Sequence, residues 1–273
     1  MKKLFISIIF VFAAVTAFGQ RLVILHVNDT HSHFEPVRSD DNAGLGGIIE
    51  RAAYVDSVRK AEGKNNVLLL HAGDFSQGTS YFQCLHGNLE IEEINAMKYD
   101  CVTLGNHEFD NGIEELTRRL SMLKCPVVCA NYDFSAFGLD KYVKPYTIIK
   151  RGGYKIGIIG LLTNVSSVVE KTTADRMRKF DDVEVANKWA ELLKKDKKCD
   201  IVIALTHLGL NTGSFNDQLL VNGTRNIDLV VGGHSHTFLE EIEYVENLDG
   251  TKVPIVQDGC WGLYVGKVLI QGR

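Results

Sequence analysis

The chain alternates short apolar, β-branched runs with segments whose apolar residues recur every three or four positions. The first pattern predicts buried strands and the second predicts amphipathic helices. The expected strands are residues 22–27, 67–70, 101–104, 127–130, 201–205 and 229–231, and the expected helices are residues 47–61, 89–97, 112–123 and 183–197. This alternation predicts an α/β fold in which a mostly parallel sheet is packed by helices on its faces.

The second half of the chain adds strand-like runs that break the alternation. Residues 146–159, 241–244, 253–257 and 264–270 are expected to form added, partly antiparallel strands. The sequence contains no repeat, low-complexity segment or linker-like stretch. Since α/β chains of about 250 residues commonly fold as one unit, we expect one domain over residues 20–273.

The first nineteen residues have the pattern of a secretory signal peptide. Lys2 and Lys3 precede an apolar run over residues 4–18, and the small residues Ala17 and Gly19 occupy the positions that a signal peptidase reads. A membrane anchor is the alternative, but the run is shorter than the ~20 residues needed to cross a bilayer. We therefore expect residues 1–19 to be removed and the protein to be exported, to the periplasm or the medium, without a stable membrane anchor.

Composition and charge exclude several other classes of protein. The 273 residues are 45% hydrophobic and 23% charged, which is typical of a globular fold rather than a disordered or fibrous one. The 30 basic and 34 acidic residues give a net charge of -4 without a run of either sign, so no nucleic-acid polymer or membrane surface is expected as a partner. Cys101, Cys129 and Cys199 lie in apolar runs and are expected to be buried free thiols, and no cysteine is expected in the functional site.

Polar clusters follow five of the expected strands, at the point where each apolar run ends. They are Asn28-Asp29-Thr30-His31, His71-Ala72-Gly73-Asp74, Gly105-Asn106-His107-Glu108-Phe109-Asp110, Thr206-His207 and Gly232-Gly233-His234-Ser235-His236. Open α/β sheets bind ligands beyond the carboxyl ends of their strands. The five clusters are therefore expected to converge in space.

Seven side chains in these clusters are candidate metal ligands: Asp29, His31, Asp74, Asn106, His207, His234 and His236. Asp29 and His31 are two positions apart, so extended backbone would direct both side chains to one face and one ion, and His234 and His236 repeat this spacing. The Asp74 carboxylate can share its two oxygens between two cations. Such a set suffices for two metal ions with water between them, which suits in-line displacement at phosphorus.

The motifs Asp29-x-His31, Gly73-Asp74, Gly105-Asn106-His107-Glu108, His207 and Gly233-His234-x-His236 resemble those of the calcineurin-like metallophosphoesterases. Residues 27–31, 105–110 and 257–266 resemble the 5′-nucleotidase branch of that superfamily, and the resemblance extends from about residue 22 to 270. It implies a four-layer α/β/β/α sandwich, with two mixed sheets flanked by helices. It also implies a metal-dependent phosphoester hydrolase of the 5′-nucleotidase type.

The resemblance also implies a role for each site residue. One divalent ion is held by Asp29, His31 and His236, a second by Asn106, His207 and His234, and Asp74 bridges the two. A hydroxide between the ions attacks phosphorus, while His107, oriented by Asp110, contacts the phosphate and stabilises the transition state or protonates the leaving oxygen. The ligand types leave the metal open among Zn, Mn, Fe and Co.

The substrate is less closely defined than the reaction. A nucleotide monoester is expected, and the alternatives are a nucleotide-sugar pyrophosphate, a sulfur ester, or no reaction in a metal- or phosphate-binding subunit of a two-chain nucleotidase. The pair His107 and Asp110 favours an enzyme, because ligands alone would suffice for binding. Members of the branch carry a C-terminal domain that recognises the nucleoside, and no part of residues 20–273 corresponds to it. A separate exported chain could supply that recognition.

Other polar residues near the motifs are expected to have plainer roles. His26, His33, His71 and His86 are expected to be structural or solvated, and Asn28 and Glu108 to support neighbouring ligands. Arg118 and Arg119 are expected to face water rather than substrate.

Overall fold

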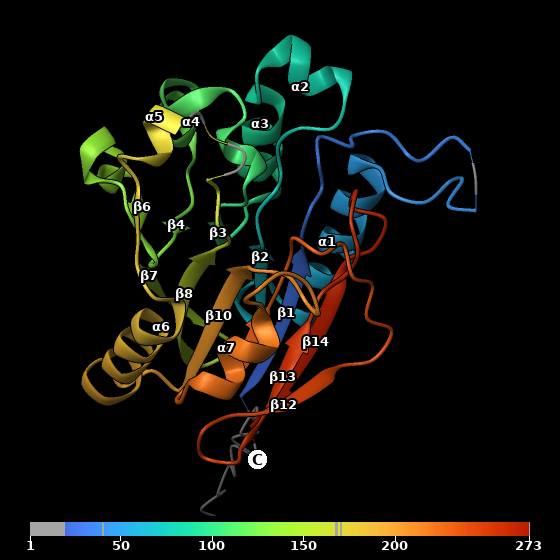
Figure 1. Ribbon diagram of the computed structural model, residues 1–273. Helices are drawn as coiled ribbons and strands as arrows, with labels where there is room; N and C mark the ends of the chain where they lie inside the picture. Colours follow the sequence, from blue (N-terminus) through green and yellow to red (C-terminus); the bar gives the residue numbers. More distant parts are fainter. Residues whose placement is uncertain (1–19, 40, 167–168, 170, 273) are drawn as a thin grey trace, which may run out of the picture.

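The computed structural model describes residues 20–39, 41–166, 169 and 171–272, so the expected signal peptide lies outside the described residues. Two six-stranded mixed sheets form the centre of this part of the chain (Figure 1). The first has the order β14 (Gly266–Gln271), β1 (Arg21–Val27), β2 (Val67–His71), β3 (Cys101–Thr103), β4 (Val127–Val128) and β6 (Val143–Lys144). The second has the order β12 (Glu243–Glu246), β13 (Lys252–Val256), β11 (Leu229–Val231), β10 (Ile201–His207), β8 (Tyr154–Leu162) and β7 (Tyr146–Arg151).

Strand direction places the chemistry-bearing loops at one end of each sheet. In the first sheet β1, β2, β3, β4 and β6 are parallel and β14 is antiparallel to β1. In the second sheet β8, β10, β11 and β13 are parallel, whereas the edge strands β7 and β12 are antiparallel to their neighbours. A small pair, β5 (Tyr132–Asp133) with β9 (Arg178–Lys179), lies outside the two sheets.

Helices cover the outer faces of the two sheets. The described helices are α1 (Ile48–Glu62), α2 (Ser80–Leu85), α3 (Asn88–Met97), α4 (Gly112–Met122), α5 (Lys171–Ala174), α6 (Asp182–Glu191) and α7 (Asp217–Gly223). Apolar residues of α1, α3 and α4 pack in one cluster with the first sheet, and those of α6 and α7 pack in another with the second sheet. A third cluster, made of strand residues, fills the space between the sheets. The four-layer α/β/β/α sandwich is thereby confirmed.

The sequence of each central strand explains how it can lie between two layers. In β1, Val23, Leu25 and Val27 join the cluster beneath the helices, whereas Leu22 and Ile24 join the cluster between the sheets. Successive side chains of a strand point to opposite faces, so a strand buried on both faces has apolar residues at every position. Burying a Leu or Ile side chain stabilises a fold by roughly 1.5–3 kcal/mol, so these continuous apolar runs are the main source of cohesion between the layers.

Most expected elements are present, and a few expectations need correction. Residues 146–159 form strand as expected, in the antiparallel hairpin of β7 and β8, which turns at Gly152 and Gly153, whose φ values of 59° and 84° favour glycine. The helix expected over residues 183–197 ends as α6 at Glu191 and continues as a π-helical turn, Leu192–Asp196. The sequence patterns also missed α2 and α7, and they indicated one sheet where the described chain has two.

The cysteines agree with the expected reduced core. In the described part of the chain no cysteine forms a disulfide, and Cys101, Cys129 and Cys199 are buried. Among the described helices, none combines the length and the apolar character needed to cross a bilayer.

Candidate metal centre

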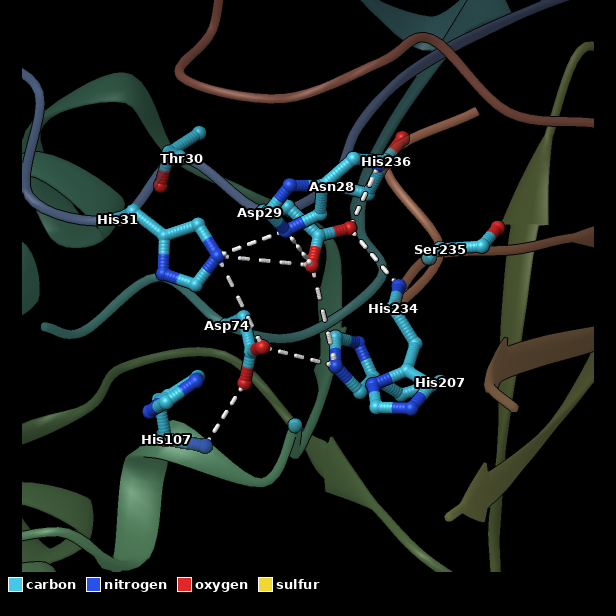
Figure 2. Close-up of polar contacts among 12 residues, drawn as sticks. Asn28, Asp29, Thr30, His31, Asp74, His107, His207, His234, Ser235 and His236 are labelled. Atoms are coloured by element: carbon cyan, nitrogen blue, oxygen red, sulfur yellow. Dashed lines mark hydrogen bonds and ion pairs between the residues drawn. The ribbon is translucent and has the colours of Figure 1, made fainter. Parts of the chain in front are cut away.

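The loops that follow β1, β2, β3, β10 and β11 meet beyond the carboxyl ends of the two sheets. Figure 2 shows that the side chains of Asp29, His31, Asp74, His207 and His236 point toward one common space. The convergence arises because parallel strands present their carboxyl ends on the same edge, and here the edges of two sheets face each other. Residues from both halves of the sequence thus form a single centre.

One group in this centre consists of Asp29, His31 and His236. The Nε2 atoms of His31 and His236 lie 3.0 Å apart, and they lie 3.7 and 3.3 Å from Oδ1 of Asp29. The Asp29 and His31 side chains are buried. Two imidazole nitrogens and a carboxylate oxygen that face one another in this way form a suitable set of ligands for a cation.

A second group consists of Asp74, His207 and His234. Nε2 of His207 lies 3.0 Å from Oδ2 of Asp74. Nδ1 of His207 lies 2.7 Å from the carbonyl oxygen of Ala72, which makes Nδ1 the donor and leaves the Nε2 lone pair directed at the centre. A metal-binding histidine commonly has its other ring nitrogen fixed by a backbone carbonyl in this manner. His31 lies 3.9 Å from Oδ2 of Asp74, so the two groups adjoin at that carboxylate.

The backbone of the ligand loops is left-handed rather than extended. The φ values are 49° at Asp29, 46° at His31, 51° at Asp74, 76° at His234 and 53° at His236. Non-glycine residues adopt this conformation rarely, and it persists where surrounding contacts over-determine it. The expectation that extended backbone aligns each pair was therefore wrong, and His234 and His236 belong to different groups. Tight turns, rather than a strand, direct these side chains inward.

Three polar atoms of these loops show that the centre fits metal ions. Oδ1 of Asp29, Oδ1 of Asn106 and Nε2 of His207 are buried without a hydrogen-bond partner among the described residues. Buried polar atoms in proteins are normally paired, and each of these three can donate a lone pair to a cation. Imidazole, carboxylate and amide donors together suit Zn, Mn, Fe or Co.

The charges within the centre are strongly coupled. Burial opposes ionisation of Asp74, but the neighbouring His207 and His31 hold the pKa of this carboxyl well below its usual value. Burial lowers the pKa of His207, yet Asp74 and Asp29 outweigh it and raise this pKa to about 10. The buried carboxylates of Asp74 and Asp29 therefore favour positive charge at this position.

His107 and Asp110 lie at the rim of the same centre. Oδ2 of Asp110 lies 2.8 Å from Nδ1 of His107, and this hydrogen bond is the main cause that raises the pKa of His107. The backbone N–H of His107 donates to Oδ1 of Asp74 at 2.8 Å (Figure 2). His107 is half-buried, so its ring can reach a molecule in the cavity. A histidine fixed in this way can donate a proton or stabilise negative charge.

A cavity of about 500 Å³ opens above the two groups. Its lining includes Asn106 and His107 and, unexpectedly, His33, Gln77 and Trp261. The rings of His33 and Trp261 stack with their centroids 4.9 Å apart, and the backbone N–H of Trp261 donates to the carbonyl oxygen of Asp29. Trp261 lies within residues 257–266, which resemble the 5′-nucleotidase branch, but no ligand motif adjoins it and its place in the cavity was not predicted.

Comparison with known proteins agrees with this geometry. Residues 22–238 match the family model described as calcineurin-like phosphoesterase. The chain belongs to the calcineurin-like phosphoesterase family. Human 5′-nucleotidase is 35% identical to it over 274 residues, which are 92% of this chain and 46% of the human protein.

Two solved structures are similar to this calcineurin-like phosphoesterase along most of its length. The 5′-nucleotidase precursor of Thermus thermophilus has a TM-score of 0.82 at 33% identity, covering 92% of this chain and 51% of that one. The NAD nucleotidase of Haemophilus influenzae has a TM-score of 0.80 at 30% identity, covering 92% and 47%. The chain thus spans about half the length of the relatives that it matches.

Several buried polar residues support the ligand loops of this phosphoesterase. Asn28 donates to Oδ2 of Asp29 at 2.7 Å and to the carbonyl of Gly259 at 2.6 Å, which confirms its expected supporting role. Gln257 accepts hydrogen bonds from the Ser235 hydroxyl and the Thr237 N–H. Sequence patterns give no sign of the Gln257 contacts, because its partners lie about twenty residues away.

One expectation about a neighbouring residue was wrong. Arg119 does not face water but is fully buried, on the same face of α4 as Leu116 and Leu120. The sequence did contain a signal for this burial, because Arg119 is three residues from Leu116 and adjacent to Leu120. Asp29 is the main cause that raises the pKa of His236 to about 10, and the nearby Cys260 adds to it.

Proposed function

We propose that this protein is a dinuclear-metal-dependent phosphoester hydrolase that acts on nucleotide monoesters. The observation that carries the proposal is the meeting of two three-residue ligand groups at Asp74, beneath a cavity that also exposes His107. Family membership makes phosphoester hydrolysis the expected chemistry, and the similarity to two 5′-nucleotidases favours a nucleotide substrate.

The proposed ligand sets follow the two groups. One ion would be held by Asp29, His31 and His236, and the other by His207, His234 and the amide oxygen of Asn106, with Asp74 between them. The unpaired oxygen of Asn106 supports its inclusion in the second set. When bound, two divalent ions lower the pKa of a water molecule and neutralise charge on phosphate oxygens.

The remaining steps fall to side chains of the chain itself. His107 would contact the phosphate from the rim of the cavity, and Asp110 would keep its Nδ1 protonated and its ring oriented. The raised pKa of His107 makes its imidazole easier to protonate, and the protonated ring can donate a proton to the leaving oxygen. Preorganised positive charge of this kind usually contributes more to catalysis than any other single effect.

A nucleotide pyrophosphate is the second candidate substrate. The similarity to a solved NAD nucleotidase favours it, because NAD contains a pyrophosphate. The same two ion sites could serve hydrolysis of a phosphomonoester or of a pyrophosphate, since both reactions are in-line displacements at phosphorus.

One experiment tests the proposal and separates the alternatives. Metal content is measured by elemental analysis, and products are followed with AMP, ADP, UDP-glucose, thiosulfate esters and p-nitrophenyl phosphate. We expect two ions per chain and phosphate release from AMP. Cleavage of UDP-glucose alone would favour the pyrophosphatase, and two ions without turnover of any compound would favour a binding subunit. Fewer than two ions at full activity would contradict the dinuclear mechanism.

Export and nucleotide recognition complete the proposal. We propose that the chain is exported and cleaved before Gln20, one residue ahead of β1, and the intact mass of the secreted protein tests this. That a separate chain supplies nucleoside recognition stays a prediction. Adding an exported chain of the recognition-domain type and measuring KM for AMP tests it, and an unchanged KM would count against it.

A further inference from the structure

The carboxylate of Glu108 is fully buried beneath the metal centre and joins two of its loops. Its Oε2 accepts hydrogen bonds from the backbone N–H groups of Asp74 at 2.9 Å and Gly105 at 2.5 Å, and its Oε1 accepts one from Ser76 at 3.0 Å. The first and third donors lie in the loop after β2, and the second lies in the loop after β3. One side chain therefore sets the distance between the loop of Asp74 and the loop of Asn106 and His107.

Arg119 connects the same two loops from the opposite side. Its Nη2 donates to the carbonyl oxygen of Glu108 at 2.6 Å, and its Nη1 donates to the hydroxyl of Ser76 at 2.6 Å. Arg119 is fully buried; burial lowers the pKa of its guanidinium, and the neighbouring Glu108 opposes that lowering. Burying two opposite charges carries a large desolvation penalty, which makes cohesion of the core a poor reason for their presence. Their hydrogen bonds instead fix two turns that carry ligands.

The turn at Asp74 needs such support. Asp74 has φ 51° and Gly73 has φ 87°, and the two loops approach so closely that a Cβ atom on Gly105 would clash with the Asp74 nitrogen. A left-handed aspartate is strained and persists only when neighbouring contacts hold it. The carboxylate of Glu108 accepts the N–H of this strained residue itself.

We propose that Glu108 is a positioning residue for the dinuclear centre. By binding the N–H groups of Asp74, Ser76 and Gly105, it holds the bridging carboxylate at the spacing that two ions require. Arg119 fixes the backbone of Glu108 and, through Ser76, the far side of the Asp74 loop. This inference rests on the proposed function, because it takes Asp74 as the ligand between the two ions.

The test compares Glu108→Gln and Glu108→Asp with Glu114→Gln, a matched control on the exposed first turn of α4. Glutamine presents N–H groups where backbone N–H donors already point, and aspartate is too short to reach both loops. Mn²⁺ affinity is measured by calorimetry, and the magnetic coupling between two bound Mn²⁺ ions by electron paramagnetic resonance. We expect both Glu108 variants to bind the second ion roughly 10–100-fold more weakly and to lose the coupled spectrum. Glu114→Gln should match the wild type.

The outcomes separate this inference from the proposed function. A coupled Mn²⁺ pair of wild-type affinity in Glu108→Gln would overturn the positioning role while leaving the proposed function intact. A wild-type protein that binds no pair of ions would overturn the proposed function itself. If circular dichroism shows that Glu108→Gln does not fold, Glu108→Asp becomes the test of the positioning role, because it retains the charge beside Arg119. Unchanged affinity in a folded Glu108→Asp would then be the contradicting result.

Discussion

The Asp74 carboxylate lies between His207 and His107, with Oδ2 at 3.0 Å from Nε2 of His207 and Oδ1 accepting the N–H of His107 at 2.8 Å. One oxygen thus faces the candidate metal ligands, and the other fixes the turn that carries His107. Because β2 and β3 belong to one sheet and β10 to the other, this carboxylate is one of the polar contacts that connect the two sheets. Loss of the Asp74 carboxylate should therefore affect both the candidate metal ligands and His107.

Asp74→Asn should therefore lower kcat/KM for AMP at least ~1000-fold. An amide lacks the negative charge with which the Asp74 carboxylate would hold two cations, and a loss of about 4 kcal/mol of transition-state stabilisation corresponds to that factor. The hydrolysis rate and the metal content are measured together, with Asp56→Asn, an exposed site on α1, as the control. Full activity in Asp74→Asn would refute the assignment of the bridging ligand.

His107→Ala should lower kcat by about 100–10,000-fold while metal content stays at the wild-type value. A positioned general acid contributes about this factor, and His107 is not among the proposed ligands. The loss should be larger for AMP than for p-nitrophenyl phosphate, because nitrophenolate leaves without protonation. Equal losses on the two substrates would mean that His107 stabilises charge rather than donating a proton, and unchanged kcat would exclude both roles.

Removing the metal should lower both activity and thermal stability. Ions that bind the native state alone stabilise it by about 2.7 kcal/mol at a concentration of 100 times Kd, which for a domain of this size corresponds to a Tm change of about 5–10 °C. Scanning fluorimetry with chelator, followed by added Mn²⁺ or Zn²⁺, measures the change and its reversal. Activity and Tm that persist after exhaustive dialysis against chelator would contradict the dinuclear mechanism.

The layer order was harder to predict from residue patterns than the elements themselves. Strands such as β1 are apolar at every position, so Leu22 and Val23 could equally face a helix or a second sheet. A parallel strand buried on both sides has the same pattern in a three-layer or a four-layer fold. The resemblance of the motifs to a known superfamily, rather than the pattern, predicted two sheets.

The ligand clusters could be predicted because the carboxyl ends of parallel strands are where open sheets bind ligands. The supporting role of Asn28 was predicted as well, whereas the contacts of Gln257 and Arg119 were not, because their partners lie far away in sequence. Buried polar partners of this kind are defined by tertiary distance, which no local pattern encodes. The left-handed backbone at Asp29 and His31 was missed for a related reason, since their N–H groups donate to carbonyl oxygens of another loop, those of Gly73 and Asp74.

Gln257→Leu should weaken metal binding or activity roughly 10–100-fold without unfolding the protein. Gln257 is buried, accepts from the Ser235 hydroxyl at 2.9 Å and the Thr237 N–H at 2.6 Å, and donates to the carbonyl of Gly233 at 3.1 Å. It therefore fixes the turn that carries both histidines of the last motif. Calorimetry with Mn²⁺ measures the loss, with the exposed Gln83→Leu as control. Wild-type Mn²⁺ affinity in Gln257→Leu would show that the turn keeps its conformation without Gln257.

His26→Leu should make stability less sensitive to acid. Burial lowers the pKa of His26 from 6.5 to about 4, and its Nδ1 has no hydrogen-bond partner among the described residues. Between those pH values the unfolded chain binds the proton and the native protein does not, so the free energy of unfolding falls as pH falls. This pKa difference corresponds to about 3 kcal/mol lost by the wild type and not by the variant. Urea titrations from pH 7.5 to 4.5 measure the free energy of unfolding, with the exposed His86→Asn as control. If the free energy of unfolding falls equally with pH in the wild type and in His26→Leu, His26 is not a cause of acid sensitivity.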